Sequence, residues 1–423
     1  MICGCGNNKT AETEKGVTDI VIWHAFGGSY RDKFINAVAE FNRTHKDIQV
    51  HAVFTPNNTS NSQKFFTSVA AGKVPDISIV DGPQVVSWAA QGALLPLDDF
   101  MKEKNLTRSD FFEPAYDETV YKGSVYALHY GVDVNFLFTW NKKIFREVGL
   151  DPERPPKTLK EHEEYDRKLR KIDPETGEIT RMGILPWSAN IPPNAMFLWG
   201  YAFGGSFYDP ATHTVTADDP KIVAALDWMG KIAESYDIKK IAAFTGGFGG
   251  YEQNPYYIGK LAMTWIGADL IKEIEKYAPN LDYGVAPWPA PEGGEYGAAW
   301  LGGWCFGLPK GCPHPKEAWE FLYWLCADPE GTKIVYDNQR VFPAVRGSKA
   351  FEEIAADDRY AIFYNVLKTC KHQRPVMPAQ ALLMGELYKA VDKVIYGQDT
   401  AENALKEVNK QVQTELDLRL AGE

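Results

Sequence analysis

Apolar and polar residues alternate along this chain in short blocks whose spacing switches between that of strands and that of helices. The apolar run from Thr18 to Trp23 predicts a short buried strand. The segment from Ser29 to His45 carries apolar residues at helical spacing, among them Phe34 and Phe41. Ile48 to Phe54 predicts the next strand, so the chain opens with a strand, a helix and a second strand.

The same alternation continues through the first hundred residues. The predicted elements are a helix over Phe65 to Gly72, a strand over Asp76 to Val80 and a helix over Gln84 to Gly92, which ends at a glycine. Alternating strands and helices predict a mostly parallel sheet covered by helices. Ligands of such sheets bind beyond the carboxyl ends of the strands, where Trp23, His24 and Asp81 stand in this sequence.

A second unit follows Tyr121 to Leu128. The run from Val134 to Trp140 predicts a strand, and Thr158 with Glu161 has capping-box spacing at the start of a helix running to about Ile172. Further expectations are a turn at residues 173–177, a helix over Ile222 to Tyr236, an ordered loop near the ligand over Thr245 to Tyr257, strands over Leu281 to Ala286 and Trp304 to Leu308, and helices over Lys316 to Ala327, Met377 to Tyr396 and Ala401 to Leu420. No repeat of solenoid or propeller length is evident.

The length and net charge of the chain limit its number of lobes and the classes of partner that it can bind. A chain of 423 residues exceeds what one hydrophobic core usually supports, so two or three lobes are expected. The formal net charge of -11 argues against a nucleic-acid partner, because such binding draws on Lys and Arg that neutralise phosphates. A neutral ligand suits this chain better.

The aromatic content points to the chemistry of that ligand. Aromatic residues make up 13% of the chain, with 12 Trp, and many stand beside Gly or Pro in expected loops. A sugar ring presents a C–H patch on each face, and covering about 50 Å² of it with an indole contributes about 1 kcal/mol. Several such contacts could hold a neutral sugar.

The N-terminus resembles the end of a bacterial lipoprotein signal. Ile2 to Cys5 gives a branched residue, a small residue and then a cysteine, followed by the polar tract Gly6 to Lys15. Cys5 is therefore expected to be acylated, with residues 1–16 as anchor and linker; an unmodified tail is the alternative. The sequence contains no run of about 18 apolar residues, so no membrane-spanning helix is expected.

The other cysteines do not predict a metal site. Cys305, Cys312, Cys326 and Cys370 lack CxxC pairs and histidine-rich spacing. A disulfide between Cys305 and Cys312 and buried free thiols both remain open. No metal and no cofactor is expected.

Short segments spread over nearly the whole chain resemble a known family. They are Ala71 to Ile77 (AGKVPDI), Gln91 to Asp98 (QGALLPLD), Tyr121 to Leu128 (YKGSVYAL), Thr139 to Phe145 (TWNKKIF), Pro155 to Thr158 (PPKT), Gly259 to Met263 (GKLAM) and Ala318 to Leu322 (AWEFL). In this order and spacing the chain resembles the extracellular solute-binding proteins of ATP-binding-cassette sugar importers, typified by maltose-binding protein. Each segment alone is a weak signal, whereas their order together is specific.

The resemblance implies an α/β, two-lobed periplasmic-binding-protein-like fold. Each lobe is expected to hold a mixed, mostly parallel sheet flanked by helices, with a cleft and a hinge between the lobes. The expected lobes are residues 17–131 plus 286–338 and residues 132–285 plus 339–423, with chain crossings near Leu128 to Val134, Val285 to Pro289 and Val335 to Pro343. The resemblance also implies membrane permease subunits as partners, a location on the outer face of the bacterial cell membrane or in the periplasm, and a monomer.

Candidate ligand contacts stand at strand ends and crossings. Trp23 could stack on a sugar and His24 could hydrogen-bond to it, and simple packing is the alternative for both. Asp81 could accept from paired sugar hydroxyls or cap the next helix. Asp133 stands in the expected first crossing, with a hinge role as its alternative.

The remaining candidates follow later in the chain. Trp265 and Trp304 are the favoured stacking platforms, and Trp300 joins Trp304 around Gly303, whose missing side chain permits close approach. Weaker candidates are Trp187, Trp199, Phe248, Tyr251 and Arg340, because a tryptophan is more often core than ligand contact.

The sequence therefore predicts capture of a sugar, preferably an oligosaccharide, and its delivery to an importer without chemical change. No GxSxG, HExxH or GxxxxGK[ST] motif is present. Two alternatives remain: a secreted glycoside hydrolase, which needs two carboxylates about the bond, and the same fold binding an iron complex, a polyamine or a phosphate ester.

Overall fold

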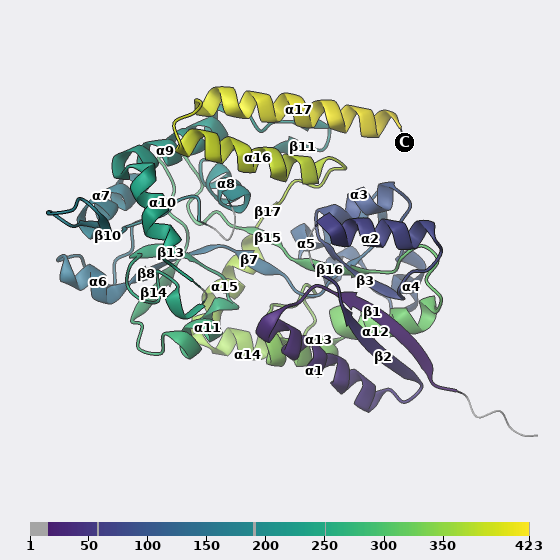
Figure 1. The fold of residues 1–423 in the computed structure, drawn as a ribbon. Helices are drawn as coiled ribbons and strands as arrows, with labels where there is room; N and C mark the ends of the chain where they lie inside the picture. The colour runs from purple at the N-terminus through teal and green to yellow at the C-terminus, as the bar shows by residue number, and fades with distance from the viewer. Residues whose placement is uncertain (1–15, 57–58, 189–191, 250, 423) are drawn as a thin grey trace, which may run out of the picture.

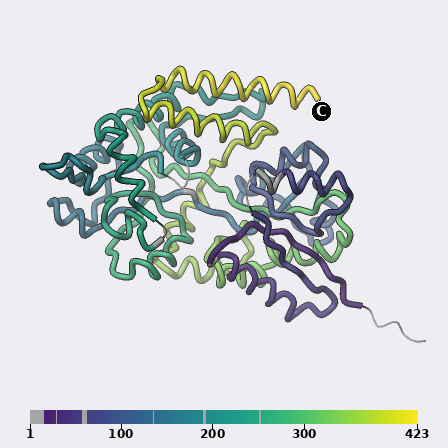
Figure 2. The backbone as a smooth tube through the Cα atoms, in the orientation of Figure 1, coloured from purple at the N-terminus to yellow at the C-terminus, as the bar shows by residue number. Residues whose placement is uncertain are grey.

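The computed structural model describes residues 16–56, 59–188, 192–249 and 251–422. Two lobes lie side by side and are joined by short central strands (Figure 1). The chain passes between the lobes more than once, so that each lobe contains segments distant in sequence (Figure 2). The two-lobed α/β architecture expected from the sequence is therefore confirmed.

The first lobe is built on a five-stranded sheet in the order β2-β1-β3-β16-β6. Its strands are β1 (Thr18–His24), β2 (Ile48–Phe54), β3 (Ile77–Asp81), β6 (Leu128–His129) and β16 (Trp304–Gly307). β1 pairs in parallel with β2 and β3, whereas β16 runs antiparallel to β3 and β6. A short hairpin of β4 (Val120–Tyr121) and β5 (Ser124–Val125) adjoins it.

Helices cover this sheet, and four of them lie where the sequence predicted helices, near residues 29–45, 65–72, 84–92 and 316–327. The helices are α1 (Gly28–Thr44), α2 (Thr59–Ala70), α3 (Gln84–Ala90), α4 (Asp98–Glu103), α5 (Glu113–Asp117), α12 (Pro315–Cys326) and α13 (Pro329–Gln339), with the short 3-10 turn η1 (Arg108–Asp110). On α1, Phe34, Val38 and Phe41 are buried against the sheet. The helical spacing read from the sequence therefore corresponds to the buried face of this helix.

The second lobe is built on a three-stranded sheet in the order β13-β8-β14. Its strands are β8 (Leu137–Asn141), β13 (Met263–Ile266) and β14 (Tyr283–Ala286). Both outer strands run antiparallel to β8. This corrects the expectation of a mostly parallel sheet in each lobe, because β13 and β14 both meet β8 in the opposite direction.

The second lobe carries most of the later helices. They are α6 (Lys142–Glu147), α7 (Leu159–Leu169), α8 (Pro192–Ala202), α9 (Pro220–Tyr236), α10 (Ile238–Gly246), α11 (Leu270–Tyr277), α16 (Gln380–Ile395) and α17 (Ala401–Ala421), together with the 3-10 turn η2 (Tyr251–Gln253). The lobe also has two small hairpins. One pairs β9 (Lys171–Ile172) with β10 (Ile179–Arg181), and the other pairs β11 (Tyr208–Asp209) with β12 (Thr214–Val215). The capping box of Thr158 and Glu161 is formed. As predicted, it begins a helix, which ends at Leu169 rather than Ile172 because the chain then enters β9.

A third sheet, in the order β17-β15-β7, lies between the lobes. Its strands are β7 (Asp133–Asn135), β15 (Trp300–Gly302) and β17 (His372–Gln373). Helix α15 (Asp358–Thr369) packs against β7, and α14 (Ala350–Ala356) packs against α15 and α13. The run expected as one strand over Val134 to Trp140 is divided between β7 and β8. These two strands belong to different sheets, so the break marks the first passage between lobes.

The second passage lies later in the chain than expected. β14 pairs in the second lobe, β15 in the central sheet and β16 in the first lobe, so the change of sheet falls at Trp300 to Gly303. Before it, Ala290 bridges Thr158, and the Trp288 ring packs against Phe138. These contacts hold residues 287–299 to the second lobe, which corrects the crossing predicted at Val285 to Pro289.

Two sequence expectations concern the membrane and the thiols. In the described residues, no helix has both the length and the apolar character needed to cross a membrane. Cys5, the predicted acylation site, lies outside the described residues. The described cysteines Cys305, Cys312, Cys326 and Cys370 are free thiols, so of the two possibilities left open at Cys305 and Cys312 the structure has the free form.

Candidate ligand-binding site

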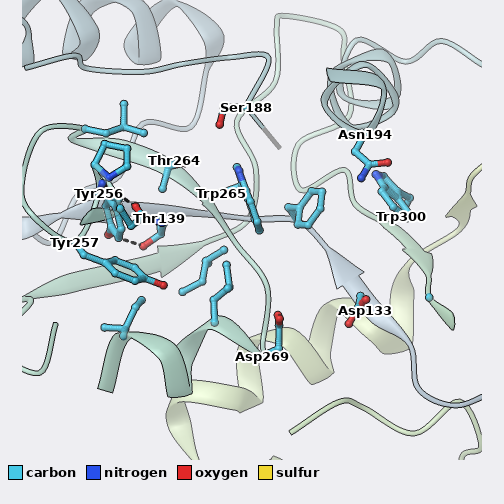
Figure 3. A pocket seen from close by; sticks show the side chains of 18 of the residues that line it. Asp133, Thr139, Ser188, Asn194, Tyr256, Tyr257, Thr264, Trp265, Asp269 and Trp300 are labelled. Atoms are coloured by element: carbon cyan, nitrogen blue, oxygen red, sulfur yellow. Dashed lines mark hydrogen bonds between the residues drawn. The ribbon is translucent and has the colours of Figure 1, made fainter. Parts of the chain in front are cut away.

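A cleft of about 670 Å³ lies between the lobes, above the central sheet. Its lining comes from both lobes and from the central strands (Figure 3). The lining includes Tyr30, Asp81, Asp133, Phe136, Thr139, Asn194, Tyr256, Tyr257, Trp265, Asp269, Trp300, Gly303, Trp304 and Arg374. No cluster of His, Cys, Asp and Glu able to hold a metal ion occurs among the described residues.

Two half-buried tryptophans present indole surface to the cleft from opposite lobes. Trp265 stands on β13 in the second lobe, and its ring centroid lies 4.4 Å from that of Phe136. Trp304 stands at the start of β16 in the first lobe, opposite Asp81 in the strand register. Both were the favoured stacking platforms of the sequence prediction, and both line the cleft.

Trp300 and Gly303 also line the cleft, with different roles. Trp300 is only 2% exposed, and its indole lies edge-on to Phe136 beneath the cleft surface. A Cβ atom at Gly303 would lie 2.5 Å from the carbonyl oxygen of Gly131. Only glycine fits there, so this position lets the β15–β16 junction approach the first crossing.

Asp81 lies in the cleft lining but is engaged by an arginine. Nη1 and Nη2 of Arg374 donate to its two carboxylate oxygens at 3.0 and 2.7 Å. The expected contact between Asp81 and sugar hydroxyls therefore stays a prediction, with Arg374 as a second partner of the carboxylate. The carboxylate remains partly exposed, and each oxygen has a second lone pair for a ligand.

Behind this pair lies a second carboxylate, Glu118. It is fully buried, 3.2 Å from Nε2 of His129 and 3.8 Å from Arg374. Burial raises the pKa of Glu118, whereas the hydrogen bond with His129 and the charge of Arg374 act to lower it. A Cβ at Gly82 would meet the Glu118 carboxylate at 1.9 Å, so this group packs directly beneath the β3–α3 turn.

The Arg374 guanidinium, which pairs with Asp81 and lies near Glu118, also stacks on an aromatic ring. The guanidinium carbon of Arg374 lies 5.1 Å from the Trp300 ring centroid, within the range of a cation–π contact. Arg374 therefore connects Asp81 of the first lobe to the central sheet. The sequence offered no local signal for it, since Asp81 and Arg374 are 293 positions apart.

Two further carboxylates, Asp133 and Asp269, face the cleft from the central sheet and from the start of α11. The Tyr30 hydroxyl on α1 donates to Asp269 at 2.5 Å, which joins the first lobe to the second. Desolvation, and then the nearby Asp269 charge, raises the pKa of Asp133. Desolvation likewise raises the pKa of Asp269, and the Tyr30 hydrogen bond acts in the opposite direction.

The far end of the cleft in the second lobe is tyrosine-rich. The Thr139 hydroxyl donates to the Gly284 carbonyl at 2.8 Å, so it accepts from the Tyr256 hydroxyl, also at 2.8 Å. Tyr257 stands beside it in Figure 3. The sequence placed an ordered loop near the ligand here, and residues 254–257 of that loop line the cleft.

Several predicted contacts lie elsewhere. His24 is 1% exposed and its ring packs 4.9 Å from Phe34, and burial, with Arg31, lowers its pKa to about 4. Trp23 lies under the Lys64 ammonium, 4.3 Å from the ring centroid, and does not line the cleft. Neither side chain lines the cleft, because successive residues of β1 point to opposite faces of the sheet, His24 into the core and Trp23 towards Lys64.

Arg340 and the weaker aromatic candidates are also outside the cleft lining. Arg340 caps α13 with a left-handed backbone (φ 62°) and pairs with Glu353 at 2.6 Å. Trp199 is fully buried, Phe248 packs edge-on against Phe244, and Trp187 is half-buried. The side chain of Tyr251 lies outside the described residues.

Sequence reasoning missed Tyr30, Asp269, Asn194 and Arg374. Asp269 follows the strand Met263–Ile266 by three residues, so the rule that strand ends line the cleft could have found it. Tyr30 and Asn194 stand near the starts of α1 and α8, with no pattern to separate them from other polar helix residues.

A smaller cavity of about 280 Å³ adjoins the cleft. It shares Tyr30, Asp133, Asp269 and Trp304 with the cleft and continues towards Phe26 and Tyr130. The interlobe hydrogen bond therefore stands between two connected spaces.

Residues 27–331 match the family described as bacterial extracellular solute-binding protein. Two curated relatives are similar over much of the chain. The sn-glycerol-3-phosphate-binding periplasmic protein UgpB of Pectobacterium atrosepticum is 25% identical over 75% of this chain and 71% of its own length. The arabinooligosaccharide-binding protein of Bacillus subtilis is 24% identical over 79% of this chain and 75% of its own.

Solved structures with the same fold are also similar to this chain. The protein CpMnBP1 with mannotriose bound is 28% identical, with a TM-score of 0.81 over 93% of this chain and 100% of that one. The same protein with mannobiose bound gives a TM-score of 0.82.

Proposed function

Because the chain belongs to the bacterial extracellular solute-binding proteins, we propose that it captures an oligosaccharide in the interlobe cleft and delivers it to the permease of an ATP-binding-cassette importer. One observation carries the proposal. Indole surfaces of Trp265 and Trp304 face the cleft from opposite lobes, together with the carboxylates of Asp133 and Asp269. Aromatic faces bind the C–H patches of sugar rings, and carboxylates accept from their hydroxyls.

The mechanism is capture followed by closure. An open form admits the sugar, both lobes contact it, and the bound population shifts to the closed form that a permease recognises. The Tyr30–Asp269 hydrogen bond belongs to that closed arrangement, because its two ends stand on different lobes. A micromolar dissociation constant corresponds to about -8 kcal/mol, within reach of several aromatic and charge-assisted contacts.

The electrostatics of the cleft favour a sugar over a phosphate ester such as the one for which UgpB is named. Arg374 is the cationic side chain among the described residues that line the cleft. Its positive charge is already paired with the carboxylates of Asp81 and Glu118. Asp133 and Asp269 add two carboxyl groups to the lining and no cation. An anionic ligand would be repelled there, whereas neutral hydroxyls find acceptors.

One experiment distinguishes binding of an intact saccharide from its cleavage. Tryptophan fluorescence and calorimetry would be recorded with mannobiose, mannotriose, arabinotriose, maltotriose and glycerol 3-phosphate, and each mixture would be chromatographed after overnight incubation. Saturable binding of a saccharide that is recovered intact is the expected result. Cleavage would establish the hydrolase alternative, and binding of glycerol 3-phosphate alone would overturn the sugar assignment.

The anchor and the oligomeric state are part of the same proposal. We expect Cys5 to carry the lipid and the protein to act as a monomer outside the cytoplasm. Membrane fractionation of Cys5→Ser should release the protein, and size-exclusion chromatography with light scattering should give the mass of one chain. Retention of Cys5→Ser on membranes would contradict the anchor.

A further inference from the structure

Three buried polar atoms that line the cleft have no hydrogen-bond partner among the described residues. They are Nε1 of Trp300, Nε of Arg374 and Oδ1 of Asn194. The three residues are between 2% and 6% exposed. Leaving a buried donor or acceptor unpaired costs about 1–3 kcal/mol, so their shared position on one cleft requires an explanation.

These groups come from separate elements that the fold brings together. Asn194 stands on α8 of the second lobe, Trp300 on the central strand β15, and Arg374 after β17. Figure 3 shows Asn194 and Trp300 at one end of the cleft, with Tyr256 and Tyr257 at the opposite end. The Arg374 guanidinium lies against the Trp300 ring. The unpaired atoms therefore belong to one end of the site.

We propose that Asn194, Trp300 and Arg374 form a specificity-determining subsite for a free hydroxyl on the terminal ring of the ligand. This inference rests on the proposed capture of an oligosaccharide. The indole and guanidine N–H groups are donors, and the Asn194 carbonyl oxygen is an acceptor. A hydroxyl can accept from donors and donate its own hydrogen to that oxygen, so it complements all three groups.

Other ligand groups fit less well. An acetal oxygen between two sugar rings has no hydrogen to donate, and an ammonium group cannot accept from the two N–H donors. A carboxylate or phosphate would lie near Asp81 and the buried Glu118, which contact the same arginine, and would be repelled. The subsite therefore selects a free hydroxyl over a charged or linked group, and its position at one end of the cleft assigns that hydroxyl to a terminal ring.

The test uses Asn194→Leu, which removes the acceptor while keeping the number and branching of the side-chain heavy atoms. Its affinity would be measured by calorimetry for the bound member of the saccharide set above and for analogues of that saccharide lacking one terminal-ring hydroxyl each. In the unmodified protein, loss of one particular hydroxyl should weaken binding about tenfold. Asn194→Leu should bind the complete saccharide about tenfold more weakly and show no further loss with that analogue.

Two more variants separate contact from folding. Asn194→Ser keeps a neutral acceptor oxygen and should retain the preference for the complete saccharide, while Asn403→Leu, on the exposed face of α17, should bind as the unmodified chain does. Thermal unfolding of each variant checks that it is folded. A loss in Asn194→Leu that is equal for every analogue, or no loss at all, would overturn the subsite. If the unmodified chain binds no saccharide, the proposed function fails, and the subsite with it.

Discussion

The hydroxyl of Tyr30 on α1 donates to the carboxylate of Asp269 at 2.5 Å, across the cleft that separates the two lobes. The bond is partly buried and joins residues 239 positions apart. It stands where the main cleft meets the smaller cavity. Opening of the lobes must break it, so its strength contributes directly to the balance between open and closed forms.

Removal of this bond should weaken ligand binding by favouring the open form. A hydrogen bond to a charged group contributes about 1.5–3 kcal/mol, so Tyr30→Phe is expected to lower affinity about tenfold. Small-angle scattering should show a larger radius of gyration for the variant without ligand. Tyr396→Phe, an exposed residue at the end of α16, is the matched control and should change neither quantity.

Acidic pH should stabilise the unliganded protein through Asp133. Its pKa is raised from 3.8 to about 8 by desolvation and by the charge of Asp269, so the folded state binds the proton more tightly than the unfolded state does. The resulting stability is complete below about pH 4 and is lost as the pH rises towards 8. Urea unfolding at several pH values should therefore show a smaller decline between pH 5 and 8 for Asp133→Asn. An identical decline in both proteins would contradict this assignment.

The Arg374 network should contribute to stability, not only to binding. Arg374→Met leaves the carboxylates of Asp81 and Glu118 without their shared cation, and loss of one partner of a buried ion pair typically costs about 3–5 kcal/mol of unfolding free energy. Arg340→Met should cost less than about 1 kcal/mol, because its pairs with Glu353 and Asp337 involve exposed carboxylates. Denaturant titrations of both variants measure their unfolding free energies. Equal losses in the two variants would contradict a special contribution of Arg374 to stability.

Trp265 should act as a stacking platform. Trp265→Ala removes an indole that lines the cleft, and the loss of about 50 Å² of ring contact corresponds to about tenfold in affinity. Trp23→Ala tests the same residue type outside the cleft, where the ring packs under Lys64. Calorimetry should find a loss for Trp265→Ala alone, and a similar loss for Trp23→Ala would point to destabilisation rather than contact.

Some site residues predicted from the sequence line the cleft and others do not, and the difference shows what a local sequence pattern can predict. Asp133 was expected at a crossing, Trp300, Gly303 and Trp304 around a glycine loop, and Trp265 as a stacking platform, and all five line the cleft. His24 also ends a strand, but β1 directs its ring into the core beside Phe34. The side of a strand end that faces the cleft depends on the neighbouring helix, which strand spacing does not reveal.

Local apolar spacing was enough to predict most helices and strands, the family resemblance gave the two-lobed class, and the aromatic content gave the aromatic character of the site. Apolar spacing sets which face of each helix or strand is buried, and this information is local. Tertiary structure alone decided which polar groups meet, since Asp81 and Arg374 are 293 positions apart and Tyr30 and Asp269 are 239 apart. It also moved the second crossing to Trp300–Gly303, because strand pairing is a contact between distant segments. Such contacts depend on the free energy of the whole packed chain, and no short stretch of residues encodes them.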